Sequence, residues 1–137
     1  MFIKTSICSL SFAFPDWCKV LVPTPVGPIP VPFPLVNFSF SCLGLINQFV
    51  MFNTGVPLHN VMTMTFISNG NEPSVPLGGL LSQRFCGTQR NMTCSLKVFV
   101  CGAPVTRWLD LSLQNGVIPN ALGISITMSQ FKYMVLT

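Results

Sequence analysis

The stretch that says most about the fold is residues 14–34, which read FPDWCKVLVPTPVGPIPVPFP. Proline lacks a backbone N–H and clashes inside a helix, and the residue before a proline is driven to extended geometry. The proline-rich part, residues 23–34, is therefore predicted to be a stiff, polyproline-like strap. A linker or a ligand of a proline-recognition domain is the alternative. We expect a strap packed on the domain surface, because a solvated linker would not carry Val22, Val26, Ile29, Val31 and Phe33.

The composition restricts the class of protein. The chain has 137 residues, enough for one domain; half of them are hydrophobic and only 7% are charged. This is typical of a membrane protein, a structural protein or a domain that buries much of its surface against a partner. No charged residue lies between Lys19 and Glu72, but the prolines exclude a membrane-spanning helix from the first part of that interval. The remaining apolar run, residues 38–52, is too short for a span, and Asn47 and Gln48 interrupt it.

Charge and cysteine content exclude further classes. The net charge is +4, and the basic residues are scattered instead of forming a stripe, so no nucleic-acid partner is predicted. The N-terminus is a poor signal peptide without a clear cleavage site. The six cysteines are therefore expected to be reduced.

Short runs rich in β-branched and aromatic residues predict an all-β fold. No stretch offers a long helical period with a cap at each end, because 12 prolines and 10 glycines interrupt the chain. Asn69-Gly70 and Asn115-Gly116 predict tight turns, since both residues tolerate positive φ. The predicted strands are residues 48–52, 62–67, 96–101 and 124–128.

The second half of the chain contains a predicted internal repeat. Gly55-Val56-Pro57 matches Gly102-Ala103-Pro104, and each follows a predicted strand. Three more pairs keep the same order about 46 residues apart: Asn69-Gly70 with Asn115-Gly116, Leu77-Gly78 with Leu122-Gly123, and Ser82-Gln83 with Ser129-Gln130. Such repeats indicate a supersecondary unit whose hydrophobic face is buried by its copy.

Together these segments resemble the PAAR-like proteins of type VI secretion. Residues 14–19 with 23–34 resemble the family's opening motif, and residues 68–73 with the Gly78-Gly79 pair resemble its central segment. Residues 100–107 resemble its later strand and turn, and residues 114–115 and 129–135 its closing segments. The motif residues singled out are Pro15, Asp16, Cys18, Pro23, Pro25, Gly27, Pro28, Pro30, Pro32, Pro34, Gly55, Pro57, Asn69, Gly70, Glu72, Pro73, Gly102, Pro104 and Arg107.

The resemblance implies a compact, conical β-domain that caps a trimeric VgrG-type spike, one chain per trimer. Its base would dock on the spike and its point would lead through the target envelope, meeting that membrane only transiently. The chain would be cytoplasmic before firing and secreted afterwards, and effectors or adaptor chaperones are further expected partners. A single chain on a three-fold axis should present three similar edges, two from the repeat and the third from the proline strap.

The resemblance covers residues 12–136, so we expect one domain over residues 1–137, with about the first 11 residues as an extension and no effector domain. The alternative function is a membrane-active or envelope-associated small β-protein, which the low charge alone favours.

No enzymatic activity and no cofactor are predicted. The wider group often holds zinc near the tip with histidines and a cysteine, but this chain has a single histidine, His59. A zinc site would have to be built from Cys86, Cys94, Cys101 and His59, whose spacing is not that of a ligand knuckle. Buried cysteines acting as small hydrophobes explain them more simply. His59 is expected to be a hydrogen-bonded turn residue, and Glu72 and Asp110 to make local turn bonds or an ion pair with an arginine.

Overall fold

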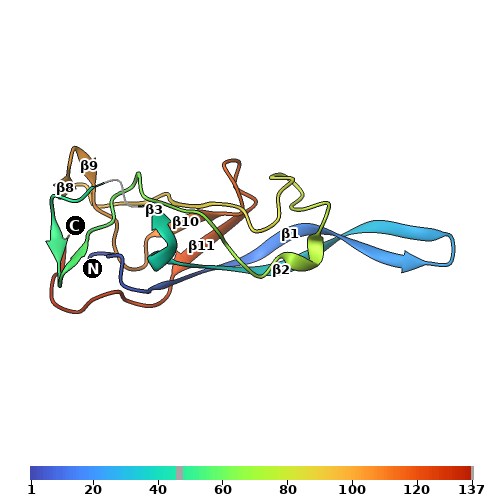
Figure 1. Ribbon diagram of the computed structural model, residues 1–137, viewed down its shortest axis with the longest axis horizontal. Coiled ribbons are helices and arrows are strands. Elements are labelled where there is room, and N and C mark those ends of the chain that lie inside the picture. Colours follow the sequence, from blue (N-terminus) through green and yellow to red (C-terminus); the bar gives the residue numbers. More distant parts are fainter. Residues whose placement is uncertain (46–47, 137) are drawn as a thin grey trace.

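A long antiparallel hairpin built from residues 10–40 is the largest element of the structure (Figure 1). In the computed structural model, which describes residues 1–45 and 48–136, strand β1 (Leu10–Thr24) pairs with β2 (Gly27–Phe40). Pro25-Val26 forms the turn, and the following Gly27 has a φ of 134°, which residues with a Cβ rarely adopt. The turn end of the hairpin projects beyond the rest of the molecule, and both chain termini lie at the opposite end.

This hairpin corrects the predicted role of the proline-rich segment. Residues 23–34 are extended, as predicted, but they form the end of β1 and most of β2 instead of a strap lying on the domain surface. Their backbone is paired in register, with Leu21 opposite Pro30 and Pro23 opposite Pro28. The apolar residues of the segment are largely exposed, since Val26 at the turn is 97% exposed and Phe33 is 50% exposed.

The alternating prolines of β2 match its position at the edge of the sheet. The N–H of Lys19 in β1 points away from β2 and donates to the carbonyl of Gly78 at 2.9 Å. Its cross-strand partner Pro32 therefore lies in a non-hydrogen-bonded pair, where an N–H would point outward. The two-residue period of a strand gives the same orientation to Pro28, Pro30 and Pro34. Along residues 28–34, the outer edge of β2 consequently lacks the donors with which another strand could pair.

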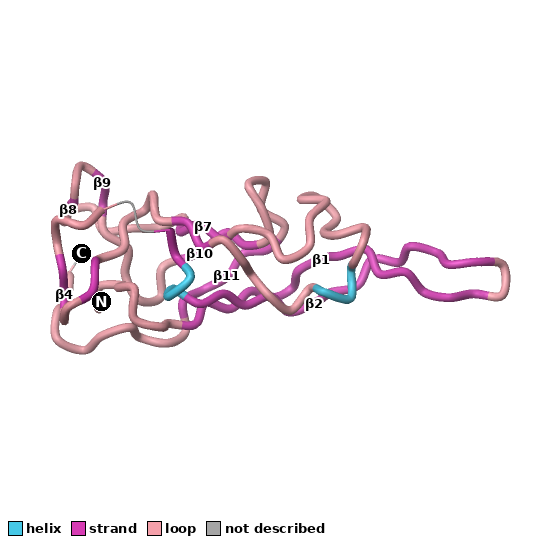
Figure 2. The backbone as a smooth tube through the Cα atoms, viewed as in Figure 1, coloured by secondary structure: helices cyan, strands magenta, loops and turns pink. Residues whose placement is uncertain are grey.

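The hairpin belongs to a seven-stranded antiparallel sheet with the order β2-β1-β11-β10-β7-β6-β3. Its edge strands β2 and β3 are separated in sequence only by the short 3₁₀ helix η1, so the sheet curls until its two edges meet along the chain (Figure 2). The other bounds are η1 (Ser41–Leu43), β3 (Gly44–Leu45), β6 (Met64–Thr65), η2 (Glu72–Ser74), β7 (Gln89–Asn91), β10 (Leu111–Gln114) and β11 (Ala121–Ser125).

Small polar side chains fill the inside of the curled sheet. The hydroxyls of Ser11 and Ser125 lie 3.0 Å apart across β1 and β11, and the Thr65 hydroxyl donates to Oε1 of Gln89 at 2.8 Å. The large apolar residues of the same strands point outward; Leu122, for example, is 60% exposed. A narrow interior accommodates hydroxyls and amides that bond one another across it, and bulky aliphatic side chains remain on the surface.

The all-β prediction is confirmed, although three of the four predicted strands are shorter than predicted and the fourth lies closer to the N-terminus. Each of the four predicted segments overlaps an observed strand: β4 (Phe52–Asn53), β6, β8 (Phe99–Val100) and β11. The longest pair, β1–β2, was not predicted, because prolines normally argue against strands. In the described part of the chain, no helix is long and apolar enough to cross a membrane.

The prolines of β2 give a testable prediction. Replacing Pro30 and Pro32 by valine keeps the extended backbone and adds two outward N–H donors to the free edge, so we expect edge-to-edge self-association. Light scattering at matched protein concentration should report a larger mass than for the unmodified chain. Pro25→Ala, which removes a proline from the turn and not from the edge, is the matched control and should behave as the unmodified chain. An unchanged mass for the double variant would contradict the assigned role.

Candidate functional site

Three hairpin-like units surround the end of the molecule opposite the long hairpin (Figure 1). The first is β4 paired with β5 (Val56–Pro57), and the second is β8 paired with β9 (Ala103–Pro104). The third joins the two ends of the chain, where Phe2 pairs with Met134. We call these units, with the segments that follow and brace them, the three-hairpin platform (residues 1–6, 48–61, 95–108 and 130–135).

The first two units have the same turn, which confirms the predicted repeat at this place. Thr54 and Gly55 have φ values of 56° and 82°, and Cys101 and Gly102 have 51° and 77°. Positive φ at both turn positions matches the right-handed twist of a two-residue hairpin, and glycine takes this conformation at the second position without strain. The likeness does not extend to Gly78, which has a φ of 71°, and Gly123, which is a strand residue of β11.

The third unit has the same pairing without a turn. Phe2 opposite Met134 corresponds to Pro57 opposite Phe52 and to Pro104 opposite Phe99. One residue further, the N–H of Val135 donates to the carbonyl of Met1 at 2.7 Å, and the N-terminal amine donates back at 2.6 Å. The predicted third edge therefore exists, but it comes from both ends of the chain and not from the proline segment. Residues 1–6, expected to be an extension, are an integral part of this unit.

Cyclic backbone hydrogen bonds relate the three units by a pseudo-threefold axis. The N–H of Lys4 donates to Thr106 at 2.9 Å, that of Thr106 to His59 at 3.2 Å, and that of His59 to Lys4 at 3.0 Å. A second ring runs in the opposite direction around the same axis: Ser6 donates to Pro57 at 3.2 Å, Val61 to Pro104 at 2.9 Å and Trp108 to Phe2 at 2.7 Å. Each segment thus bonds to the next in the same way, although their sequences differ.

Polar residues at equivalent positions brace the platform. The amide nitrogen of Gln48 donates to the carbonyl of Leu58 at 2.8 Å, and that of Gln130 donates to the carbonyl of Ile3 at 3.2 Å. In the remaining unit the backbone N–H of Ser95 donates to Val105 at 2.8 Å. The acceptors Ile3, Leu58 and Val105 are themselves equivalent, and their side chains belong to the small apolar core.

Exposed apolar side chains also repeat three times on the platform. Phe52, Phe99 and Met134 are 55%, 57% and 57% exposed. A second set at equivalent positions, Phe49, Leu96 and Phe131, is 69%, 84% and 73% exposed. Apolar groups exposed to this degree and arranged around a common axis form an interaction surface with threefold character.

Two titratable residues lie buried beneath this surface. Burial, and then the nearby charge of Lys4, lowers the pKa of His59 to about 3, and the Ser6 hydroxyl lies 3.1 Å from its Nε2. Burial lowers the pKa of Lys4 to about 8, although its Nζ donates to the hydroxyls of Ser11 and Ser125 at 3.0 and 2.9 Å. A neutral imidazole of such low basicity acts as a hydrogen-bonding core residue and is unsuited to general-base catalysis near neutral pH.

A buried carboxylate, Asp16, connects the long hairpin to the body. Strand pairing runs as Ala13 opposite Asn37 and resumes as Asp16 opposite Leu35, so residues 14 and 15 form a bulge. The extra residue reverses the inward and outward alternation, because side chains of a strand alternate with a period of two. Ala13 and Asp16 consequently both point into the interior, where Asp16 is fully buried.

Four asparagine amides donate to the Asp16 carboxylate. The Nδ2 atoms of Asn37, Asn115 and Asn71 lie 3.0, 3.1 and 3.2 Å from Oδ2, and Asn120 donates to Oδ1. Asn37 belongs to β2, Asn71 precedes η2, and Asn115 and Asn120 both lie in the connection between β10 and β11. The carboxylate therefore fixes three segments at one point through charge-assisted hydrogen bonds.

The orientation of three of these amides is set by hydrogen bonds to their oxygens. Backbone N–H groups donate to the amide oxygens, Cys86 to Asn71 at 2.9 Å, Gly87 to Asn115 at 3.3 Å and Leu81 to Asn120 at 2.8 Å. The nitrogens must then face the carboxylate, so the cluster presents donors to an anion and does not present oxygens to a cation. We call this arrangement the Asp16 cage.

The remaining motif residues surround the Asp16 cage or the platform. Cys18 is fully buried, and burial followed by the Asp16 charge raises its pKa to about 12, which makes it an inert packing residue. The N–H of Gly70 donates to both oxygens of Glu72 at 2.9 Å and lowers the pKa of that carboxyl. Arg107 forms an ion pair of 3.2 Å with Asp110. A local turn bond or an ion pair with an arginine was predicted for Glu72 and Asp110 and is confirmed for both.

The metal candidates lie apart in the structure. Cys101 is exposed in the β8–β9 turn, whereas His59 is buried in the platform and Cys86 lies 3.8 Å from Glu72. Cys94 offers its backbone carbonyl to Arg107 at 3.0 Å. Within residues 1–45 and 48–136, no three histidine, cysteine, aspartate or glutamate residues are grouped as metal ligands would be.

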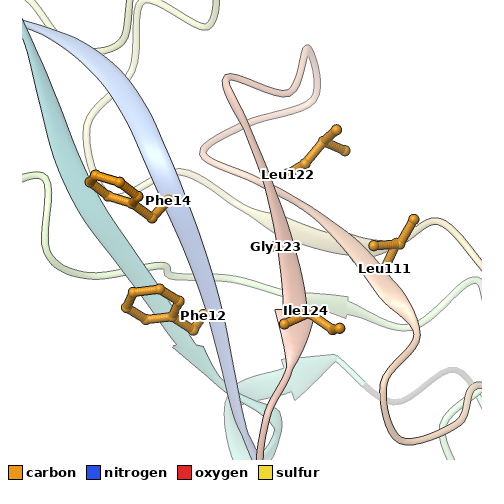
Figure 3. Close-up of a pocket in the computed structure, with 6 residues that line it drawn as sticks. All are labelled: Phe12, Phe14, Leu111, Leu122, Gly123 and Ile124. Carbon is orange, nitrogen blue, oxygen red and sulfur yellow. The ribbon is translucent and has the colours of Figure 1, made fainter.

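An apolar face lies on the side of the body, over β1, β10 and β11. Figure 3 shows a shallow hollow between Phe12 and Phe14 on one side and Leu111, Leu122 and Ile124 on the other. It carries no charged side chain among its lining residues. Unlike the platform, this face has no repeated arrangement.

Sequence reasoning missed several of the residues that build these sites. Asn37 and Asn120 of the Asp16 cage carried no recognised signal. Gln130 lay in a recognised repeat pair, but with Ser82-Gln83 as its proposed match instead of Gln48. The spacing from Gln48 to Leu58 and from Ser95 to Val105 is the same, and this spacing could have indicated the bracing role.

The buried imidazole predicts a pH effect on stability. His59 is the only histidine, and its pKa of about 3 lies below the ordinary value of 6.5, so the unfolded state binds one more proton between these values. Stability should therefore fall as the pH drops from 6.5 to 5, by at most ~1.4 kcal/mol per pH unit. Urea unfolding should show this slope in the unmodified chain and its loss in His59→Gln. An equal slope in both proteins would contradict the assignment.

The Asp16 cage predicts a large loss of stability on a nearly isosteric change. Asp16→Asn removes the negative charge and replaces one carboxylate oxygen by an NH2 group, which then faces the N–H donors of the surrounding asparagines. Because these donors lose their acceptor, the free energy of unfolding should fall by at least ~3 kcal/mol. Glu72→Gln, a control at an exposed carboxylate, should change it by less than ~1 kcal/mol. Chemical denaturation at neutral pH measures both. Similar losses in the two variants would contradict a particular contribution of the Asp16 cage to stability.

The comparison with known families agrees with this architecture. A family model described as a toxin PAAR-like domain matches residues 9–121, which include the long hairpin, the Asp16 cage and two of the three platform units. Neither a curated protein nor a solved structure shows significant similarity to the chain. Because the match covers well over half of the sequence, the chain belongs to the toxin PAAR-like domain family.

Proposed function

We propose that this protein is the tip of a bacterial contractile secretion machine of the type VI kind. The three-hairpin platform docks on the end of a trimeric VgrG-type spike, one chain per trimer, and the long hairpin forms the leading point. The role is mechanical and not enzymatic. The protein is assembled in the cytoplasm, leaves the cell on the spike and contacts the target membrane during puncture. Effectors or adaptor chaperones are further partners that family analogy suggests.

The observation that carries this proposal is the pseudo-threefold platform. A trimer ends in three equivalent surfaces, and a single chain can satisfy them only if it presents three similar edges. The cyclic hydrogen bonds among Lys4, His59 and Thr106 supply the symmetric frame. The exposed sets Phe52, Phe99, Met134 and Phe49, Leu96, Phe131 supply apolar contacts at equivalent positions.

The position of the long hairpin supports this orientation, in which the platform faces the spike and the hairpin leads. It extends from the end of the molecule opposite the platform, so a docked platform leaves the hairpin pointing away from the spike. Prolines restrict the backbone φ along β2 and reduce the freedom that an unsupported hairpin would otherwise have. The Asp16 cage holds the middle of the hairpin to the body. A stiff projection anchored in this way suits a piercing tip.

Co-expression with a trimeric spike protein encoded beside this chain tests the proposal. We expect a purified complex whose mass corresponds to one chain and three spike subunits. Replacing Phe52 and Phe99 by aspartate places charges in two of the three docking contacts, and the yield of complex should fall at least about tenfold.

The matched control carries two aspartates on the side face. Phe14→Asp with Leu122→Asp changes the same number of exposed apolar residues away from the platform and should leave complex formation unchanged. Loss of the complex in the control but not in the platform variant would place the docking surface on the side face. A chain that never binds the spike and partitions into detergent would instead favour the membrane-active alternative.

A further inference from the structure

The root of the long hairpin contains a pair of adjacent thiols. Cys8 precedes β1 and Cys42 lies in η1 just after β2, and the two residues are 34 positions apart in sequence. Their Sγ atoms lie 2.6 Å from each other, and both residues are exposed. The other cysteines have no such neighbour among the described residues, since Cys18 is buried against amides and Cys86 faces Glu72.

Strand register explains why these two thiols meet. Leu10 lies opposite Phe40 at the end of the β1–β2 pair, and Cys8 and Cys42 each lie two residues beyond these partners. The N–H of Ser41 donates to the carbonyl of Ser9 at 2.9 Å, so that intervening pair is hydrogen-bonded. Cys8 and Cys42 directly flank this hydrogen-bonded pair on the same side, and their Sγ atoms approach each other to 2.6 Å. Two cysteines whose side chains face each other this closely can form a disulfide without a large backbone movement.

We propose that Cys8 and Cys42 are a redox-modification site, which closes to a disulfide when the chain meets an oxidising disulfide compound. One of the two thiols, as its thiolate, attacks the disulfide of the oxidant and forms a mixed disulfide, releasing one oxidant thiolate. The second cysteine, as its thiolate, then attacks the protein sulfur of that mixed disulfide and releases the other oxidant thiolate. The two cysteine sulfurs lose two electrons and two protons, and the oxidant disulfide gains the electrons.

The position of the site gives the bond a mechanical consequence. It joins the strand ends where the hairpin enters the body, next to the buried pair Ser9 and Ser41, whose hydroxyls lie 2.9 Å apart. A covalent link there prevents the edge strand β2 from separating from β1 at its base. Reduced thiols inside the producing cell and a disulfide after export would follow from the proposed function, on which this biological setting rests.

The experiment uses the full chain purified in reductant and then held in a mixture of oxidised and reduced glutathione. After acid quench, the protein is unfolded and alkylated so that the buried Cys18 is also labelled. We expect a monomer with two of its six thiols protected and its mass lower by two hydrogen atoms. Chymotrypsin can cleave after Phe12 and Trp17, which separates Cys8 from Cys18, and the linked peptides should contain Cys8 and Cys42.

Variants make the result decisive. In Cys8→Ser, all of the remaining thiols should stay free after oxidation. In Cys101→Ser, which removes another exposed thiol, oxidation should still protect two thiols from alkylation. Oxidation should raise the thermal midpoint by several degrees in the unmodified chain and in Cys101→Ser, but not in Cys8→Ser. Full alkylation of the oxidised chain, a persistent glutathione adduct, a different pairing or a disulfide-linked dimer would overturn the proposal. None of these measurements requires the spike, so they are independent of the docking test.

Discussion

The hydrogen bonds to the Asp16 carboxylate hold together parts of the chain that are distant in sequence. Amides of Asn37, Asn71, Asn115 and Asn120 converge on it from β2, from the segment before η2 and from the connection between β10 and β11. A buried carboxylate is costly unless it is well solvated by donors, so each donor segment is constrained to one position. The hairpin is thereby anchored in its middle, one end continuing into the sheet and the other remaining free.

The same preference for polar contacts governs the rest of the interior. The curled sheet is too narrow for large aliphatic side chains, and Ser11, Ser125, Thr65 and Gln89 bond across it in their place. Large apolar side chains are then left on the outside, which explains how a chain with half of its residues hydrophobic has only a small apolar core. A partner that covers the exposed apolar side chains of such a domain would stabilise it. The platform is the surface on which these side chains are arranged most regularly.

The platform also shows how an asymmetric chain can acquire threefold character. The two hairpins of the repeat supply two units, and the two ends of the chain meet to supply the third. Backbone hydrogen bonds carry the symmetry, because each ring uses only N–H and carbonyl groups. Side chains can therefore differ among the units, as they do at Lys4, His59 and Thr106, without disturbing the frame.

The sequence by itself determined the all-β class, the family resemblance, the extended geometry of the proline segment and the repeat of Gly55-Val56-Pro57 in Gly102-Ala103-Pro104, because these depend on local backbone restrictions and on residue order. Only the tertiary structure decided which strands pair. A strand of alternating prolines is recognisable as an edge strand only when its partner β1 is known, and the Asp16 cage unites residues as far apart as Asp16 and Asn120. The third platform unit depends on contact between residues 1–3 and 133–135, and local sequence carries no signal for a pairing of such long range.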